Sequence, residues 1–168
     1  MCRRPKKCTT MRVVPSRWLP PKGFTAISFF GRVLMREKNY DDWLQDASSK
    51  DYEDLCHHEW IHLRQAVSVH NSWFCYYTLY LWYYLKGHPL RYGSGTCYLT
   101  NPFELEAYLF EEDAQYAQSG EEGATGWRRL ALYPPSFWRA LMLDTSPGHR
   151  LKQDEFIKRV REFMEDKW

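Results

Sequence analysis

The sequence predicts a mainly α-helical chain with a small β element, an α+β fold in a single domain. Residues 24–36 are rich in β-branched and aromatic residues, which is typical of strands. The stretch 49–86 and a shorter one that begins at Asn101 both carry helix-start signals. We expect these two helices to pack against each other within one domain over residues 24–168, a length that suffices to bury a core.

Residues 1–23 are expected to form a flexible basic arm ahead of this domain. Nine basic residues and no acid occur between Met1 and Arg36, and four prolines fall within the first 23 residues. Like charges and prolines together argue against a packed element. No apolar segment follows the charges, so the arm is unlike a secretory signal. Met11 is an alternative start of the chain.

The net charge and the cysteine content indicate which partners and which cellular location to expect. The net charge of +2 is too small to indicate a nucleic-acid partner. The 5 cysteines are scattered and form no CxxC pair, so we expect no disulfide framework and a cytoplasmic location. The oligomeric state is left open.

The stretch from Phe24 to Arg36, interrupted by Gly31, predicts one kinked strand or a short hairpin. Two roles are open for it. In a peptidase, an edge strand holds an extended substrate by main-chain pairing. The other reading is a strand that only covers the helical core.

The stretch 49–86 predicts a long helical region. Ser48 and Ser49 precede a run of acids, which is a strong helix start. Residues 66–85 carry no formal charge and match a membrane span in length, but polar residues in the first half and Tyr and Trp in the second argue against spanning. We expect a helix that is buried on most sides or lies against a membrane surface, and that Gly87 and Pro89 terminate.

This helix contains the pattern His58-Glu59-x-x-His62. Residues four apart lie on one helix face, so both imidazoles can hold one Zn²⁺. Glu59 can then reach a water on the same ion as a general base. Asp54, four residues before His58, is either a contact of that ring or, as we favour, compensation for the helix dipole.

A third ligand is expected from the helix that begins at Asn101, where Asn101 is the cap and Pro102 the first helical residue. Its first turns carry Glu104 and Glu106. Glu104 shares a face with the small Ala107, which favours a close approach, but it also suits a capping box. Helix geometry leaves Glu104 and Glu106 both open as the third ligand.

An HExxH pattern followed on a later helix by Glu104-x-x-Ala107 resembles the gluzincin class of zinc metallopeptidases. The resemblance implies that His58, His62 and Glu104 hold the metal and that Glu59 activates the water. The blocks at 58–65 and 102–108 also resemble small uncharacterised bacterial proteins with HExIHxRQ and FExEAY blocks. This likeness covers roughly residues 24–117.

The chain departs from the gluzincin pattern at some positions. Tyr108 stands where many gluzincins carry Asp or Asn, and Trp60 and Ile61 are bulky for the interior of HExxH. Candidate donors to a developing oxyanion are Arg64, Tyr98 and Tyr108.

Three C-terminal stretches are expected to be helical and to complete the core: residues 127–132, 136–143 and the amphipathic 154–168. The expected function is that of a zinc-dependent metallopeptidase, which hydrolyses peptide bonds of a peptide or protein substrate through a zinc-bound water. The alternative is a non-catalytic helical protein, with a peripheral membrane contact and a structural or vestigial metal site. The sequence leaves the substrate open.

Overall fold

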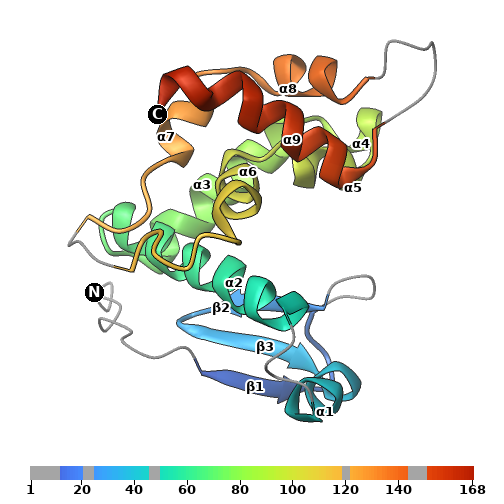
Figure 1. The fold of residues 1–168 in the computed structure, drawn as a ribbon, viewed down its shortest axis with the longest axis vertical. Coiled ribbons are helices and arrows are strands. Elements are labelled where there is room, and N and C mark those ends of the chain that lie inside the picture. Colours follow the sequence, from blue (N-terminus) through green and yellow to red (C-terminus); the bar gives the residue numbers. More distant parts are fainter. Residues whose placement is uncertain (1–11, 21–24, 46–49, 119–121, 144–150) are drawn as a thin grey trace. The chain divides into compact units, whose positions relative to one another are not determined.

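The computed structural model of the chain describes residues 12–20, 25–45, 50–118, 122–143 and 151–168. Over these residues it is mainly helical with one three-stranded sheet, which confirms the predicted α+β class (Figure 1). The chain divides into two compact units, one made of residues 1–75 and 110–124, the other of residues 76–109 and 125–168. The predicted domain boundary after residue 23 stays a prediction.

The sheet of the first unit consists of strands β1 (Val13–Ser16), β2 (Ala26–Phe29) and β3 (Arg32–Arg36), in the order β1-β3-β2. β2 and β3 are antiparallel and form the hairpin that was one of the two predicted forms. Phe30 and Gly31 connect them with φ angles of 47° and 82°, because a two-residue hairpin turn needs this left-handed backbone.

Strand β1 lies in the predicted flexible arm, so that prediction is wrong for residues 13–16. β1 runs parallel to β3, with Val13 opposite Val33 and Val14 opposite Leu34. Two adjacent β-branched residues favour a strand, and Pro15 is tolerated because β1 is an edge strand. Residues 1–11 and 21–23 of the expected arm lie outside the described residues.

The sheet carries a small apolar core. Ala26, Val33 and Met35 are buried, and Val13, Leu55 and two aromatics of helix α1 (Glu37–Gln45) pack against them, namely Tyr40 and Trp43. Helix α2 (Lys50–Ser68) packs on β2. This contact sets the position of the helix that carries HExxH.

The predicted helical region 49–86 is two helices, α2 and α3 (Trp73–Lys86), so a single helix is wrong. His70 and Asn71 break it with φ angles of 54° and 52°, a conformation that Asn tolerates better than most residues. The predicted caps Ser48 and Ser49 lie outside the described residues. α3 ends just before Gly87, as predicted. No helix in the described part of the chain has the length and apolar character to cross a membrane.

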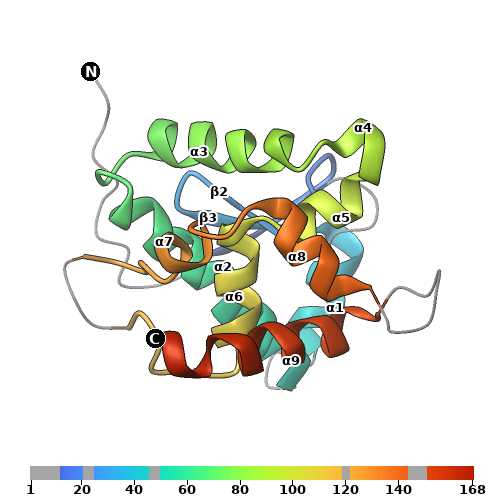
Figure 2. The same ribbon diagram turned by 90° about the horizontal axis from the view of Figure 1, so that it is seen from above.

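The second unit contains α4 (Pro89–Tyr92), α5 (Ser94–Leu99), α6 (Pro102–Phe110), α7 (Trp127–Leu130), α8 (Pro135–Met142), α9 (Gln153–Met164) and the short 3₁₀ helix η1 (Glu165–Lys167). Helices α7, α8 and α9 confirm the three predicted C-terminal stretches (Figure 2). The buried ring of Phe103 is the centre of an aromatic core, with ring centroids 4.6 to 6.1 Å from those of Tyr76, Tyr80, Tyr83 and Trp127.

Candidate metal centre

The HExxH pattern lies in the middle of α2, where the helix is buried. His58, Glu59 and His62 are all buried, and β2 covers the same stretch. The hydroxyl of Ser28 on β2 donates to the backbone oxygen of Glu59 at 3.0 Å. The sheet therefore fixes α2 at the turn that carries the motif.

Both motif histidines have one ring nitrogen engaged by an acceptor. Nδ1 of His58 lies 2.8 Å from Oε2 of Glu111, and Nδ1 of His62 lies 2.8 Å from Oε1 of Gln65. A carboxylate or an amide oxygen accepts only, so the hydrogen of each neutral ring is on Nδ1. Each Nε2 is then left with a lone pair, the form in which imidazole binds a metal.

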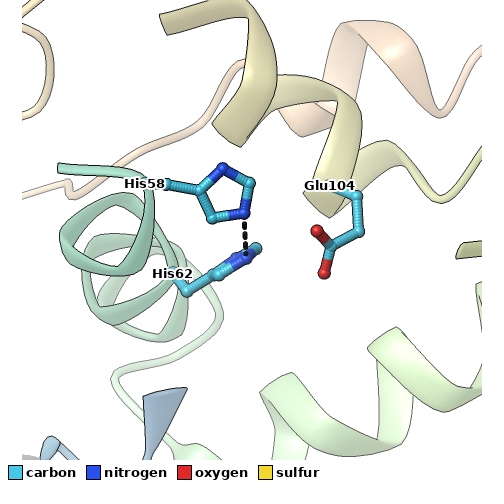
Figure 3. A group of neighbouring side chains, drawn as sticks. All are labelled: His58, His62 and Glu104. Atoms are coloured by element: carbon cyan, nitrogen blue, oxygen red, sulfur yellow. Dashed lines mark hydrogen bonds between the residues drawn. The ribbon is translucent and has the colours of Figure 1, made fainter. Parts of the chain in front are cut away.

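The two Nε2 atoms lie 3.2 Å apart, with the rings at 81° to each other (Figure 3). Two lone pairs at this distance repel unless a cation or a proton lies between them. Tetrahedral zinc with Zn–N bonds of about 2.0–2.1 Å places two nitrogens about 3.3 Å apart. The spacing of the histidines therefore fits a metal ion.

The helix that carries the third candidate ligand begins as predicted. Oδ1 of Asn101 accepts from the N–H of Phe103 at 3.2 Å, and Pro102 is the first helical residue. The side-chain amide of Asn101 also donates to the backbone oxygen of Tyr80 at 3.2 Å. The hydroxyl of Tyr80 donates to Oε1 of Glu104 at 2.5 Å, which fixes that carboxylate.

His58, His62 and Glu104 form a buried group that could hold a metal ion. Each offers one ligand atom, and these atoms lie within 4.8 Å of one another. Figure 3 shows the two imidazoles of α2 and the carboxylate of α6 around a common point. Glu106, the other candidate, does not belong to this group, and its Oε1 accepts from the backbone N–H of Gly126 at 2.5 Å.

Glu59, the expected general base, is 5% exposed. Among the described residues, its Oε2 atom has no hydrogen-bond partner. The pKa of the neighbouring Cys56 thiol is raised, first by burial and then by the charge of Glu59. A buried carboxylate oxygen without a donor is suited to accept a proton from a water molecule.

The sequence did not predict the two side chains that contact the motif histidines, Gln65 and Glu111. Gln65 follows His62 by three residues, so helical spacing was a usable signal. Glu111 is 53 residues from His58 and gave no such local signal. The carboxylate that contacts the ring of His58 is that of Glu111, not that of Asp54.

Two of the three predicted oxyanion donors lie near Glu104. Burial raises the pKa of Tyr98 far above its usual range, and the charge of Glu104 adds to this, so its hydroxyl stays neutral. The hydroxyl of Tyr108 donates to that of Tyr98 at 3.4 Å. The guanidinium of Arg64 lies 5.9 Å from the ring centroid of Trp60, and helix geometry places both on the face of α2 opposite His58. Arg64 is therefore not brought to the histidines.

A comparison of the chain with protein-family models, with curated proteins and with solved structures finds no match. The resemblance to gluzincins therefore rests on residues 58–62 and 104–107 themselves.

Proposed function

We propose that this chain is a zinc-dependent metallopeptidase. The observation that carries the proposal is the buried group of His58, His62 and Glu104, with the unsatisfied carboxylate oxygen of Glu59 on the same helix as both histidines. Two imidazoles and one carboxylate are the donor set of many catalytic zinc sites, which keep a fourth position open.

When bound, zinc supplies Lewis-acid chemistry that acidifies water and polarises a carbonyl. Glu59 takes the proton from the water whose oxygen forms the new bond to the peptide carbonyl carbon. It then returns that proton to the amine nitrogen as the carbon–nitrogen bond breaks. Burial of Glu59 keeps competing water away from this proton.

Three further side chains have a positioning role in this scheme. Glu111 and Gln65 hold the Nδ1 atoms of the two histidines, so their Nε2 atoms stay directed to the metal position. Tyr80 holds one oxygen of Glu104.

The substrate in this proposal is an extended peptide or a protein segment. β2 is an edge strand of the sheet, and its Ser28 hydrogen-bonds to the backbone of Glu59. An extended chain that pairs with an edge strand gains main-chain hydrogen bonds in a fixed register. The proposal includes a cytoplasmic location, because the five cysteines of the sequence are scattered and form no CxxC pair.

Metal analysis followed by peptide-library digestion tests the proposal. We expect about one equivalent of zinc per chain after reconstitution. We also expect cleavage that a chelator abolishes and that Glu59→Gln strongly reduces without loss of the metal. A reconstituted protein that binds no zinc would overturn the proposal. Zinc binding without any cleavage would favour the non-catalytic alternative.

A further inference from the structure

Helix α3 has an apolar face that is exposed. The side chains of Leu81, Trp82 and Leu85 are 54%, 60% and 52% exposed and fall within an arc of about 100° on the helix. Phe74, 70% exposed, lies on the same stripe, which runs for about 16 Å along the helix. Figure 2 shows α3 as an unbroken helix that leads into α4, where Leu90 is fully exposed.

This face is not needed to hold α3 in its unit. The opposite face carries Tyr76, Tyr80 and Tyr83, whose rings contact Phe103. Those aromatics already supply the packing of the helix. An exposed apolar stripe on a helix that is anchored by its other face indicates a binding surface.

The charged residues near the stripe indicate what kind of surface it binds. Residues 66–103 contain no Asp or Glu. They contain two basic residues, Lys86 and Arg91, and both are exposed. Helical geometry places Lys86 beside Trp82, at the edge of the stripe. The stretch is therefore apolar and basic, and it complements an anionic surface.

We propose that the outer face of α3 binds the surface of an anionic lipid membrane, with the helix lying parallel to it. The 14 residues of α3 span about 21 Å, less than the roughly 30 Å of a bilayer core, so the helix lies on the membrane and does not cross it. Leu81, Trp82 and Leu85 enter the boundary between headgroups and acyl chains, where Trp is favoured. Lys86 and Arg91 contact anionic headgroups, each contributing about fivefold in affinity.

Co-sedimentation of the full-length protein with vesicles tests this surface. The vesicles are phosphatidylcholine alone or phosphatidylcholine mixed with phosphatidylglycerol. We expect binding to the mixed vesicles that weakens with added salt. Lys86→Gln with Arg91→Gln should weaken that binding by about 25-fold, which is fivefold for each charge. Lys158→Gln, an exposed lysine on α9, is the matched control and should bind like the wild type.

The apolar contribution needs a second variant. Leu81→Ser, Trp82→Ser and Leu85→Ser combined should abolish binding to the mixed vesicles. Leu132→Ser with Leu143→Ser, two exposed leucines elsewhere in the same unit, should not. Thermal unfolding of each variant verifies the fold. If the serine variant misfolds, the charge variant still tests the proposal, and its binding to the mixed vesicles as tightly as the wild type would overturn it.

Three further outcomes would overturn the proposal. One is a wild-type protein that binds neither vesicle. Another is a serine variant that is folded and binds as well as the wild type. The third is a wild-type protein that forms an oligomer and does not bind vesicles, together with a serine variant that is monomeric. This result would make the face a contact between copies of the chain. None of these outcomes depends on zinc content or on hydrolysis.

Discussion

Nδ1 of His58 lies 2.8 Å from Oε2 of Glu111, and the adjacent His57 holds the backbone of the same residue. The ring nitrogens of His57 lie 2.9 Å from the backbone oxygen of Glu111 and 3.2 Å from that of Tyr116. Two consecutive histidines of α2 therefore fix both the main chain and the side chain of Glu111. His57 fixes the position of Glu111 through its backbone, and His58 is oriented by the carboxylate of Glu111.

Glu111→Gln should lower zinc affinity by about 10- to 100-fold. The amide can still accept a hydrogen bond from His58, but it lacks the negative charge that makes the ring a stronger ligand. Competition with a chromophoric chelator measures the affinity. Glu112→Gln is the control, because Glu112 is exposed and forms a surface ion pair with Lys50 at 3.7 Å. Equal losses in both variants would refute the role of Glu111.

Glu104→Gln should lower zinc affinity by more than about 100-fold, since the loss of a direct ligand exceeds that of an orienting group. Glu106→Gln should keep the affinity, because its amide oxygen can still accept from the N–H of Gly126. The same chelator competition applies to both. A larger loss in Glu106→Gln would make Glu106 the third ligand.

Glu59→Gln should reduce kcat by about 10²- to 10⁴-fold, the usual contribution of a general base. Zinc content should stay unchanged, because Glu59 lies outside the ligand group. The measurement is the rate on a peptide identified from the library digestion, with zinc determined on the same sample. Glu53→Gln, an exposed residue of the same helix, should keep the wild-type rate. Retained activity in Glu59→Gln would mean that another group takes the proton.

Local signals were enough to find the motif and the start of α6. HExxH has helical spacing, and Asn101 with Pro102 marks the beginning of α6, so both were predicted from a few adjacent residues. Glu104 and Glu106 could not be separated this way, since the choice depends on the Gly126 backbone contact, 20 residues from Glu106.

What the sequence did not reveal depends on contacts between distant residues. The sequence predicts an arm at β1 because the strand that pairs with it, β3, lies 20 positions further along the chain. The break at His70 and Asn71 is an exception with a local cause. Neither residue is a proline or glycine, but Ser72 accepts from the N–H of Cys75 at 3.3 Å, and a serine at this position is a helix-start signal. The orienting role of Glu111 depends on its contact with His58, which no spacing rule gives.

Gly123→Ala should destabilise the fold around α2. Gly123 has a φ of +78°, and a Cβ there would lie 2.2 Å from the backbone oxygen of Arg64. The next residue, Ala124, donates its N–H to that same oxygen at 3.2 Å, so the segment cannot move away without losing this bond. We expect the free energy of unfolding to fall by more than about 1 kcal/mol, because both the φ angle and the close contact exclude a side chain.

Thermal unfolding measures the effect, with a fall in Tm of at least roughly 2–4 °C for a chain of this size. Gly95→Ala is the matched control, since Gly95 lies in α5 and a Cβ there meets no heavy atom within 4 Å. Alanine in a helix is favoured over glycine, so this control should be neutral or stabilising by up to about 1 kcal/mol. Equal shifts of Tm in the two variants would show that the close approach of Gly123 to α2 is absent. Because Arg64 lies between His62 and Gln65, a loss confined to Gly123→Ala would show that the close contact of residues 123–124 with this turn of α2 stabilises the fold.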